Sequence, residues 1–286
     1  MFSHALTADE LFLNLPVKTD LESLKKELGE LVIAQKISER DGLFFLPGRE
    51  NILAFKEENK KAGERKMQRA LFIAKIFRFI PWVKMIAIAN VMGEGNFKEE
   101  SDIDLFIVTK KKKIWLTRFF TVLTTDLLRW RPKVNDTKDK ICLSFFVTKD
   151  NLNVEKLLLD SEKPEIPAIS RDPYFVYWLA NLLPIYDHGL CEKMIQENSW
   201  FSQELPNWRA KKIQSVRRSR SSMLAIINLV FGSFERVTKK IQLKIIPQKI
   251  KDLDHKGTEV VISDQILKFH TNDRRIMYKN RLFLDK

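Results

Sequence analysis

Two apolar segments on either side of a polar, glycine-bearing loop place the strongest constraint on the fold of this chain. They are "WVKMIAIANV" (82–91) and "DIDLFIV" (102–108). Both are short and rich in aliphatic and β-branched residues, which is typical of strands. An amphipathic helical segment (114–130) and a third apolar segment, "ICLSFFV" (141–147), come next. Strands that alternate with a helix predict an α/β (α+β) domain built on a small mixed sheet.

Two carboxylates stand at the head of the second apolar segment. Asp102 and Asp104 are separated by one residue, so we expect both on one face of the strand, with Ile103 and Leu105 on the other. Adjacent carboxylates repel each other and are costly to bury without a partner. A divalent cation removes this conflict, and Mg²⁺ is typically held by one or two carboxylates with substrate phosphates and water. The pair is therefore a candidate metal–nucleotide platform, against the alternative of two solvated carboxylates at a loop edge.

The pattern divides the chain into three predicted units. Residues 1–68 form a small N-terminal unit with a linker helix, and residues 69–160 form the sheet-containing core. Residues 161–286 form a basic region that we predict to be helical, because no strand pattern is evident after about residue 150.

The N-terminal unit has the outline of a winged helix-turn-helix. Thr7 with Glu10, and Thr19 with Glu22, have the spacing of capping boxes, which predicts two short helices. The "DG" pair (41–42) between "ISER" and "LFFL" predicts a hairpin. Such a module contacts nucleic acid or serves as a packing unit, and both alternatives remain open.

The charge of the chain is concentrated near its C-terminal end. The net charge is +13 and the sequence pI about 9.6. Between Arg209 and Lys256 there are 13 Lys or Arg residues and three acids. This excess predicts contact with RNA or DNA through residues 209–256. The alternatives are a solvated helix face and, with the apolar segment 223–234, an anionic membrane surface.

Cysteine usage and the apolar pattern favour a cytoplasmic protein without a transmembrane segment. Cys142 and Cys191 are far apart, which excludes a disulfide framework and a zinc-finger spacing. Cys142 lies within an apolar strand and is expected in the core. The N-terminus lacks a basic region followed by an apolar stretch, and the longest apolar run (223–234) is too short to span a bilayer.

Other catalytic signatures are missing from the sequence. There is no Walker-type phosphate loop, no nucleophile elbow and no dinucleotide-binding glycine fingerprint. The four histidines show no metal-ligand spacing. Asp187 with His188, and His270 with Asp273, are expected to be capping or packing pairs rather than catalytic ones.

The stretch from the first strand to "SDIDLFIV" (101–108) resembles the signature of the nucleotidyltransferase superfamily, which includes DNA polymerase β, kanamycin nucleotidyltransferase and the small bacterial MNT-type proteins. In that family two aspartates bind Mg²⁺, and a third carboxylate on a later strand activates the acceptor hydroxyl. Asp102, Asp104 and Ser101 match the motif. The third carboxylate has no clear counterpart, because the strand "ICLSFFV" carries Ser144 in its middle and Asp139 lies just before it.

The family's phosphate-binding element is altered in this chain. The family places a Gly-Ser pair at a helix N-terminus about twelve residues ahead of the first aspartate, and that pair holds the nucleotide phosphates. Asn90 and Val91 occupy these positions here, and Gly93 and Gly95 are the nearest glycines. The resemblance implies that residues 90–95 hold the phosphates.

The resemblance extends over most of the chain, to a group of uncharacterised bacterial proteins with a nucleotidyltransferase domain. The shared segments include "IPWV" (80–83), "KICLSFF" (140–146), Tyr186-Asp187 and "FHTNDRR" (269–275). It implies Mg²⁺-dependent transfer of a nucleoside monophosphate from a nucleoside triphosphate to a hydroxyl acceptor such as RNA. The alternative is a catalytically inactive nucleotidyltransferase fold that binds nucleic acid.

Overall fold

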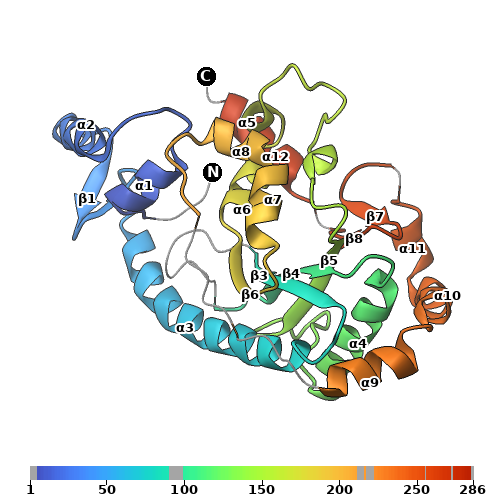
Figure 1. Ribbon diagram of the computed structural model, residues 1–286. Helices are drawn as coiled ribbons and strands as arrows, with labels where there is room; N and C mark the ends of the chain where they lie inside the picture. The colour runs from blue at the N-terminus through green and yellow to red at the C-terminus, as the bar shows by residue number, and fades with distance from the viewer. Residues whose placement is uncertain are drawn as a thin grey trace.

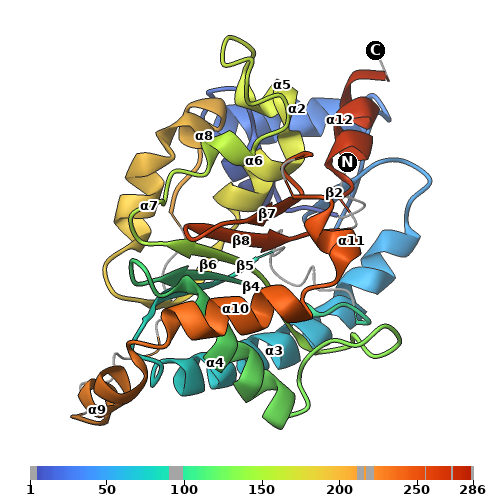
Figure 2. The same ribbon diagram turned by 90° about the vertical axis from the view of Figure 1, so that its right-hand side faces the viewer.

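The computed structural model describes residues 5–89, 99–210, 216, 222–254, 256–271 and 273–284. At its centre lies a six-stranded sheet in the order β6-β3-β4-β5-β8-β7, with helices against both faces (Figure 1; Figure 2). Neighbouring strands are antiparallel, except that β4 and β5 are parallel. The mixed sheet confirms the predicted α/β class. The strands are β3 (Val83–Ile88), β4 (Ile103–Thr109), β5 (Ile141–Thr148), β6 (Leu183–Asp187), β7 (Val260–Ile262) and β8 (Ile266–Phe269).

The N-terminal unit contains two helices and a hairpin. Its elements are α1 (Ala8–Asn14), α2 (Leu21–Ile33), β1 (Ser38–Arg40) and β2 (Leu43–Phe45). The first capping box is confirmed, because Thr7 Oγ1 accepts from Glu10 N at 3.1 Å and Glu10 Oε2 accepts from Thr7 N at 2.9 Å. The second is wrong by one residue: Asp20, itself a strong capping residue, accepts from Ser23 N and begins α2.

The hairpin and the linker helix follow the predicted pattern. Asp41 and Gly42 have φ angles of 55° and 75°, the left-handed conformation that a two-residue β-turn requires. Helix α3 (Asn51–Phe77) then runs for 27 residues along one side of the molecule (Figure 1). Pro81 follows it, and β3 begins two residues later.

The alternation of β4 separates two buried apolar clusters. Ile103, Leu105 and Ile107 belong to a cluster with buried residues of α3 and of α4 (Ile114–Leu127). Phe106 and Val108 belong to a second cluster on the opposite face, which includes buried residues of α6 (Pro173–Ala180). Burial of both faces explains why the strand is almost continuously apolar after Asp104.

The prediction that no strand follows residue 150 is wrong. β6 pairs with β3, and the β7–β8 hairpin adds to the edge of β5, so three late strands complete the sheet. These strands are three to five residues long, too short for a periodic signal, and their partners are distant in sequence. The accompanying helices are η1 (Glu155–Leu157), α5 (Ala168–Arg171), α7 (Cys191–Glu197), α8 (Ser199–Glu204), α9 (Ser222–Phe231), α10 (Glu235–Ile245), α11 (Gln248–Lys251) and α12 (Arg275–Leu284).

A buried ion pair fastens α12 to α6. Arg275 Nη1 donates to Asp172 Oδ2 at 2.9 Å and to the carbonyl of Leu157 at 2.8 Å, and both charged side chains are almost fully buried. Asp172 also caps α6 by accepting from Phe175 N at 3.0 Å. Within the described residues, no helix is long and apolar enough to cross a bilayer.

Candidate metal-binding site

Three side chains converge where β4 and β5 begin. The donor oxygens of Asp102 and Asp104 and the Sγ atom of Cys142 all lie within 4.8 Å of one another. The parallel register aligns Asp104 with Cys142, so the thiol is placed beside the carboxylates by strand pairing. Among the described His, Cys, Asp and Glu residues, no other group of three lies this close together.

The environment of the three groups is partly buried and strongly negative. Each of the three residues is half-buried. Burial raises the pKa of Asp102, against opposing contributions from its backbone N–H, the Cys142 thiol and Lys66. Burial, followed by the charges of Asp104 and Asp102, raises the pKa of the Cys142 thiol well above its ordinary value. Such a site favours a cation that neutralises the carboxylates.

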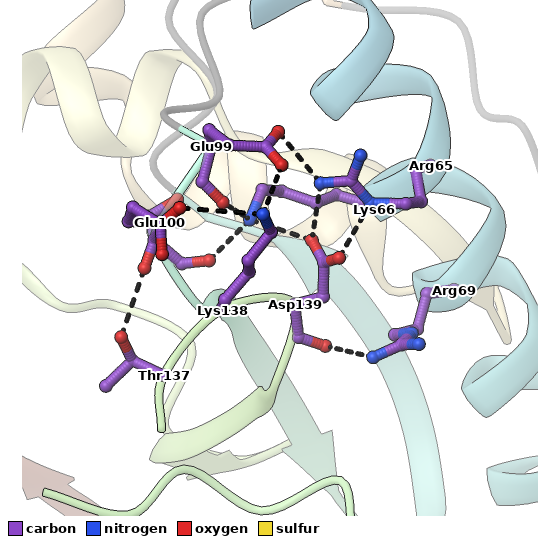
Figure 3. A network of polar contacts seen from close by, with 9 residues as sticks. Arg65, Lys66, Arg69, Glu99, Glu100, Thr137, Lys138 and Asp139 are labelled. Carbon is purple, nitrogen blue, oxygen red and sulfur yellow. Dashed lines mark hydrogen bonds and ion pairs between the residues drawn. The ribbon is translucent and has the colours of Figure 1, made fainter. Parts of the chain in front are cut away.

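Lys66 fixes the residues that lead into β4. Its side chain reaches from α3 and is fully buried. Its ammonium donates to the carbonyl of Glu99 at 3.1 Å and to the carbonyl of Ser101, and it pairs with Asp139 Oδ1 at 3.0 Å. The three donors of the ammonium are therefore all used. Figure 3 shows Lys66 and Arg65 extending from α3 toward Asp139.

An outer layer of charged contacts surrounds Lys66. Arg65 Nε donates to Asp139 Oδ2 at 2.7 Å, and Arg65 Nη2 donates to Glu99 Oε2 at 2.9 Å. Lys138 pairs with the other Glu99 oxygen at 2.5 Å, and Arg69 Nη1 donates to the Asp139 carbonyl at 2.9 Å (Figure 3). Burial alone would raise the pKa of Asp139. The hydrogen bonds from Arg65 and Lys66 outweigh this effect and lower the pKa below its ordinary value, which favours the ionised carboxylate.

Asp139 is therefore not the third carboxylate of the cluster. Its φ angle of 58° and its ion pairs direct it toward α3, and its backbone N–H donates to the carbonyl of Ser101 at 3.2 Å. Cys142 occupies the third position instead. The expectation that Cys142 is simply a core residue is wrong, because its sulfur lies beside the two carboxylates.

A polar chain continues from Cys142 along the edge of β5. Ser144 hydrogen-bonds the Cys142 thiol, and Ser144 Oγ lies 3.3 Å from His270 Nε2. Burial lowers the pKa of His270 to about 4, so the imidazole is neutral at physiological pH. Burial raises the pKa of the Tyr174 hydroxyl on α6, and the nearby charge of Asp104 raises it further. Neither neighbour has a local sequence signal that links it to the aspartates, because each lies more than 60 residues from them.

A cavity adjoins this edge of the sheet. Cys142 and Ser144 line a space of about 650 Å³ together with residues of α4, α10 and α11. Arg118 lies on its wall, where Nη1 donates to Gln242 Oε1 at 2.7 Å and the guanidinium sits 4.7 Å from the centre of the Phe269 ring.

The predicted phosphate-binding residues are not all placed by the structure. Asn90, Val91, Gly93 and Gly95 lie outside the described residues. Ser101 is described, and its carbonyl accepts from Lys66 and from the Asp139 N–H.

The two polar pairs expected from the sequence have different partners in the structure. Asp187 accepts from Leu190 N at 2.8 Å at the start of α7, as a capping residue does, while His188 Nε2 lies 2.6 Å from the Tyr186 hydroxyl. Asp273 pairs with Arg275 rather than with His270.

The donor set fits Mg²⁺ in part. Two carboxylates are the usual protein ligands of Mg²⁺, which completes its coordination with water and phosphate oxygens. Sulfur is a ligand for softer cations such as Zn²⁺, so Cys142 would remain outside the coordination sphere of Mg²⁺.

Comparison with known proteins identifies no relationship: no protein-family model, no curated protein and no solved structure matches the chain.

Proposed function

We propose that the chain is a Mg²⁺-dependent nucleotidyltransferase that moves a nucleoside monophosphate from a nucleoside triphosphate to a hydroxyl acceptor. The observation that carries this proposal is the convergence of Asp102 and Asp104 at the start of a central strand. The sequence resemblance to the nucleotidyltransferase superfamily supplies the reaction. A bound Mg²⁺ would neutralise the charge of the triphosphate and orient it.

The reaction is a phosphoryl-group displacement. The acceptor oxygen bonds to the α-phosphorus, the bond from that phosphorus to the bridging α–β oxygen breaks, and pyrophosphate leaves. The acceptor hydroxyl loses its proton. No third carboxylate lies in the cluster of described residues, and the raised pKa of the Cys142 thiol makes it a poor base near neutral pH. We therefore assign this proton to solvent or to substrate phosphate.

The protein side of the mechanism is positioning. Asp102 and Asp104 would hold the cation, and Lys66 holds the backbone just ahead of them through the carbonyls of Glu99 and Ser101. Fixing the ligands before substrate arrives reduces the entropy lost in reaching the reactive geometry. Residues 90–95 would complete the site by holding the phosphates.

The acceptor is proposed to be RNA. The net charge of +13 and the six Lys or Arg residues between Arg209 and Arg220, ahead of α9, favour a polyanion, and a winged-helix-like N-terminal unit would add a second contact. One observation favours the alternative of an inactive nucleic-acid-binding protein, namely the thiol of Cys142 in place of a third carboxylate.

Calorimetric titration tests the nucleotide site. Each of the four nucleoside triphosphates is titrated with Mg²⁺ into the wild type, into Asp102→Ala/Asp104→Ala and into Asp150→Ala/Asp252→Ala. The last variant makes the same charge change at surface positions outside the cluster. We expect Mg²⁺-dependent binding that the site variant weakens at least about tenfold and the control variant retains.

Turnover is then measured as pyrophosphate release in the presence of bulk transfer RNA. Release that requires both Mg²⁺ and the two aspartates supports the transferase. If the wild type binds none of the nucleotides, the proposal is wrong. Salt-dependent RNA binding without nucleotide binding would instead support the inactive alternative.

A further inference from the structure

Helix α9 exposes a large apolar surface. Ile226, Leu229 and Val230 are 59%, 83% and 52% exposed. Their spacing of three and four residues places them on one face of the helix. Phe231 and Phe234, which follow, are also exposed. Figure 2 shows α9 projecting at the lower edge of the molecule, at the end of α10. Contiguous exposed apolar surface of this kind marks an interaction site.

Helix α10 continues the apolar surface as a stripe. Val237, Ile241 and Ile245 are spaced four residues apart and are 49%, 42% and 72% exposed. The side of the helix next to this stripe faces the protein, where buried Gln242 donates from Nε2 to the carbonyl of Trp115 at 2.7 Å. The helix is thus held on the body by one face while a second, apolar face remains open.

A stripe of positive charge runs beside the apolar stripe. Arg236, Lys240 and Lys244 each precede one of the exposed apolar residues and are themselves exposed. None of the three forms an ion pair with a carboxylate of the described residues, whereas the neighbouring Lys239 pairs with Asp264 at 2.6 Å. A helix with adjacent exposed apolar and cationic stripes has the chemistry of the bilayer interface.

We propose that the exposed surface of α9 and α10 docks on an anionic lipid bilayer. The apolar stripe enters the boundary between headgroups and acyl chains, and the three cations contact lipid phosphates. Nucleic acid would satisfy the cations but leave the apolar stripe in water. A second copy would cover the apolar stripe but bring two sets of unpaired cations together. An anionic bilayer satisfies both stripes, and this inference does not depend on the proposed enzymatic activity.

The test measures binding to vesicles by flotation. The full chain is mixed with vesicles of phosphatidylcholine alone and of phosphatidylcholine with about 30% phosphatidylglycerol. We expect strong binding only to the anionic vesicles. Arg236→Gln/Lys240→Gln/Lys244→Gln is expected to weaken binding about 100-fold, because each cation near the surface contributes about fivefold. Ile226→Ser/Leu229→Ser/Ile241→Ser is expected to weaken it at least about tenfold.

Two variants of the N-terminal unit serve as matched controls. Val17→Ser/Ile33→Ser/Leu46→Ser removes apolar side chains that are 63%, 84% and 56% exposed. A second control, Lys18→Gln/Lys26→Gln/Lys36→Gln, makes the same charge change at exposed lysines. Both controls are expected to bind anionic vesicles as the wild type does, and circular dichroism verifies that each variant is folded.

Three results would overturn the proposal. The first is a wild type that does not bind anionic vesicles. The second is full binding by the apolar variant, which would mean that charge alone acts, as on nucleic acid. The third is a wild-type dimer in solution that the apolar variant converts to monomer, which would identify a second copy as the partner.

Discussion

Replacing Lys66 by methionine is expected to destabilise the fold by about 3 kcal/mol. Methionine fills much of the same volume but donates no hydrogen bond. Lys66 is fully buried and donates to the carbonyls of Glu99 and Ser101 while it pairs with Asp139. Each lost bond to a carbonyl costs about 1 kcal/mol. The lost ion pair is expected to cost about 1 kcal/mol more. Breaking an isolated buried pair would cost more than this, but Arg65 still pairs with Asp139 at 2.7 Å.

A double-mutant cycle isolates the ion pair. Asp139→Asn alone leaves the buried Lys66 ammonium without its carboxylate and is expected to cost about 3 kcal/mol. The double variant is expected to cost about 4 kcal/mol, which corresponds to a coupling energy of about 2 kcal/mol. Urea unfolding followed by tryptophan fluorescence measures all three variants. Lys60→Met, an exposed position on the same helix, is the control and should change stability by less than about 0.5 kcal/mol. A coupling energy below about 0.5 kcal/mol would refute the assignment.

Three further predictions concern the cluster, the α6–α12 contact and a buried lysine. Cys142→Asp supplies a third oxygen donor and is expected to raise Mg²⁺ affinity at least about tenfold by calorimetry; unchanged affinity would contradict the shared site. Asp172→Asn removes one of the two carboxylates that pair with the buried Arg275 guanidinium, which keeps its pair with Asp273 at 2.6 Å, and is expected to cost about 1–3 kcal/mol in urea unfolding, whereas a cost below about 0.5 kcal/mol would argue against the pair. Burial lowers the pKa of Lys268 from 10.5 to about 7, so between these values the unfolded chain binds one more proton than the folded chain, and stability rises with pH. Lys268→Met should remove that part of the rise, and equal pH slopes in the two proteins would count against it.

Much of the central sheet was predictable because its signals are local. The segments around β3, β4 and β5 are apolar, short and bounded by polar residues, and α4 has a clear helical period. The pair Asp102 and Asp104 followed from strand alternation alone, and the structure places Ile103 and Leu105 on the opposite face, as expected. These features depend on residues a few positions apart, which is the range over which a sequence pattern is informative.

The late strands were not predictable for the opposite reason. β6 follows the apolar helix α6 after two residues, so the apolar pattern has no visible break between helix and strand. What makes Leu183–Asp187 a strand is the free edge of β3, which lies about 100 residues earlier in the chain. Tertiary pairing of this kind overrides local propensity.

The third residue of the cluster was also not predictable, because its place depends on the pairing of distant segments rather than on a local sequence pattern. Cys142 lies beside Asp104 because of the register of two parallel strands, and a register shift follows directly between that pair and the Phe106–Phe145 pair. Asp139 is nearer the expected position in sequence, but its left-handed backbone and the cations of α3 direct it elsewhere. Neither effect has a local sequence signal.

The α9–α10 surface and the candidate metal site are connected through α10, α4 and a cavity that both border. Helix α10 packs on α4: Glu235 accepts from the N–H groups of Trp115 and Leu116 at 3.0 and 2.9 Å, which also places a carboxylate at the α4 N-terminus. Helix α4 covers the face of β4 that carries Ile103 and Leu105. Asp104 alternates to the other face of β4. Ile245 of the exposed apolar stripe lines the same cavity as Cys142 and Ser144, so a bilayer docked on α9 and α10 would lie at one wall of the cavity that adjoins the carboxylates.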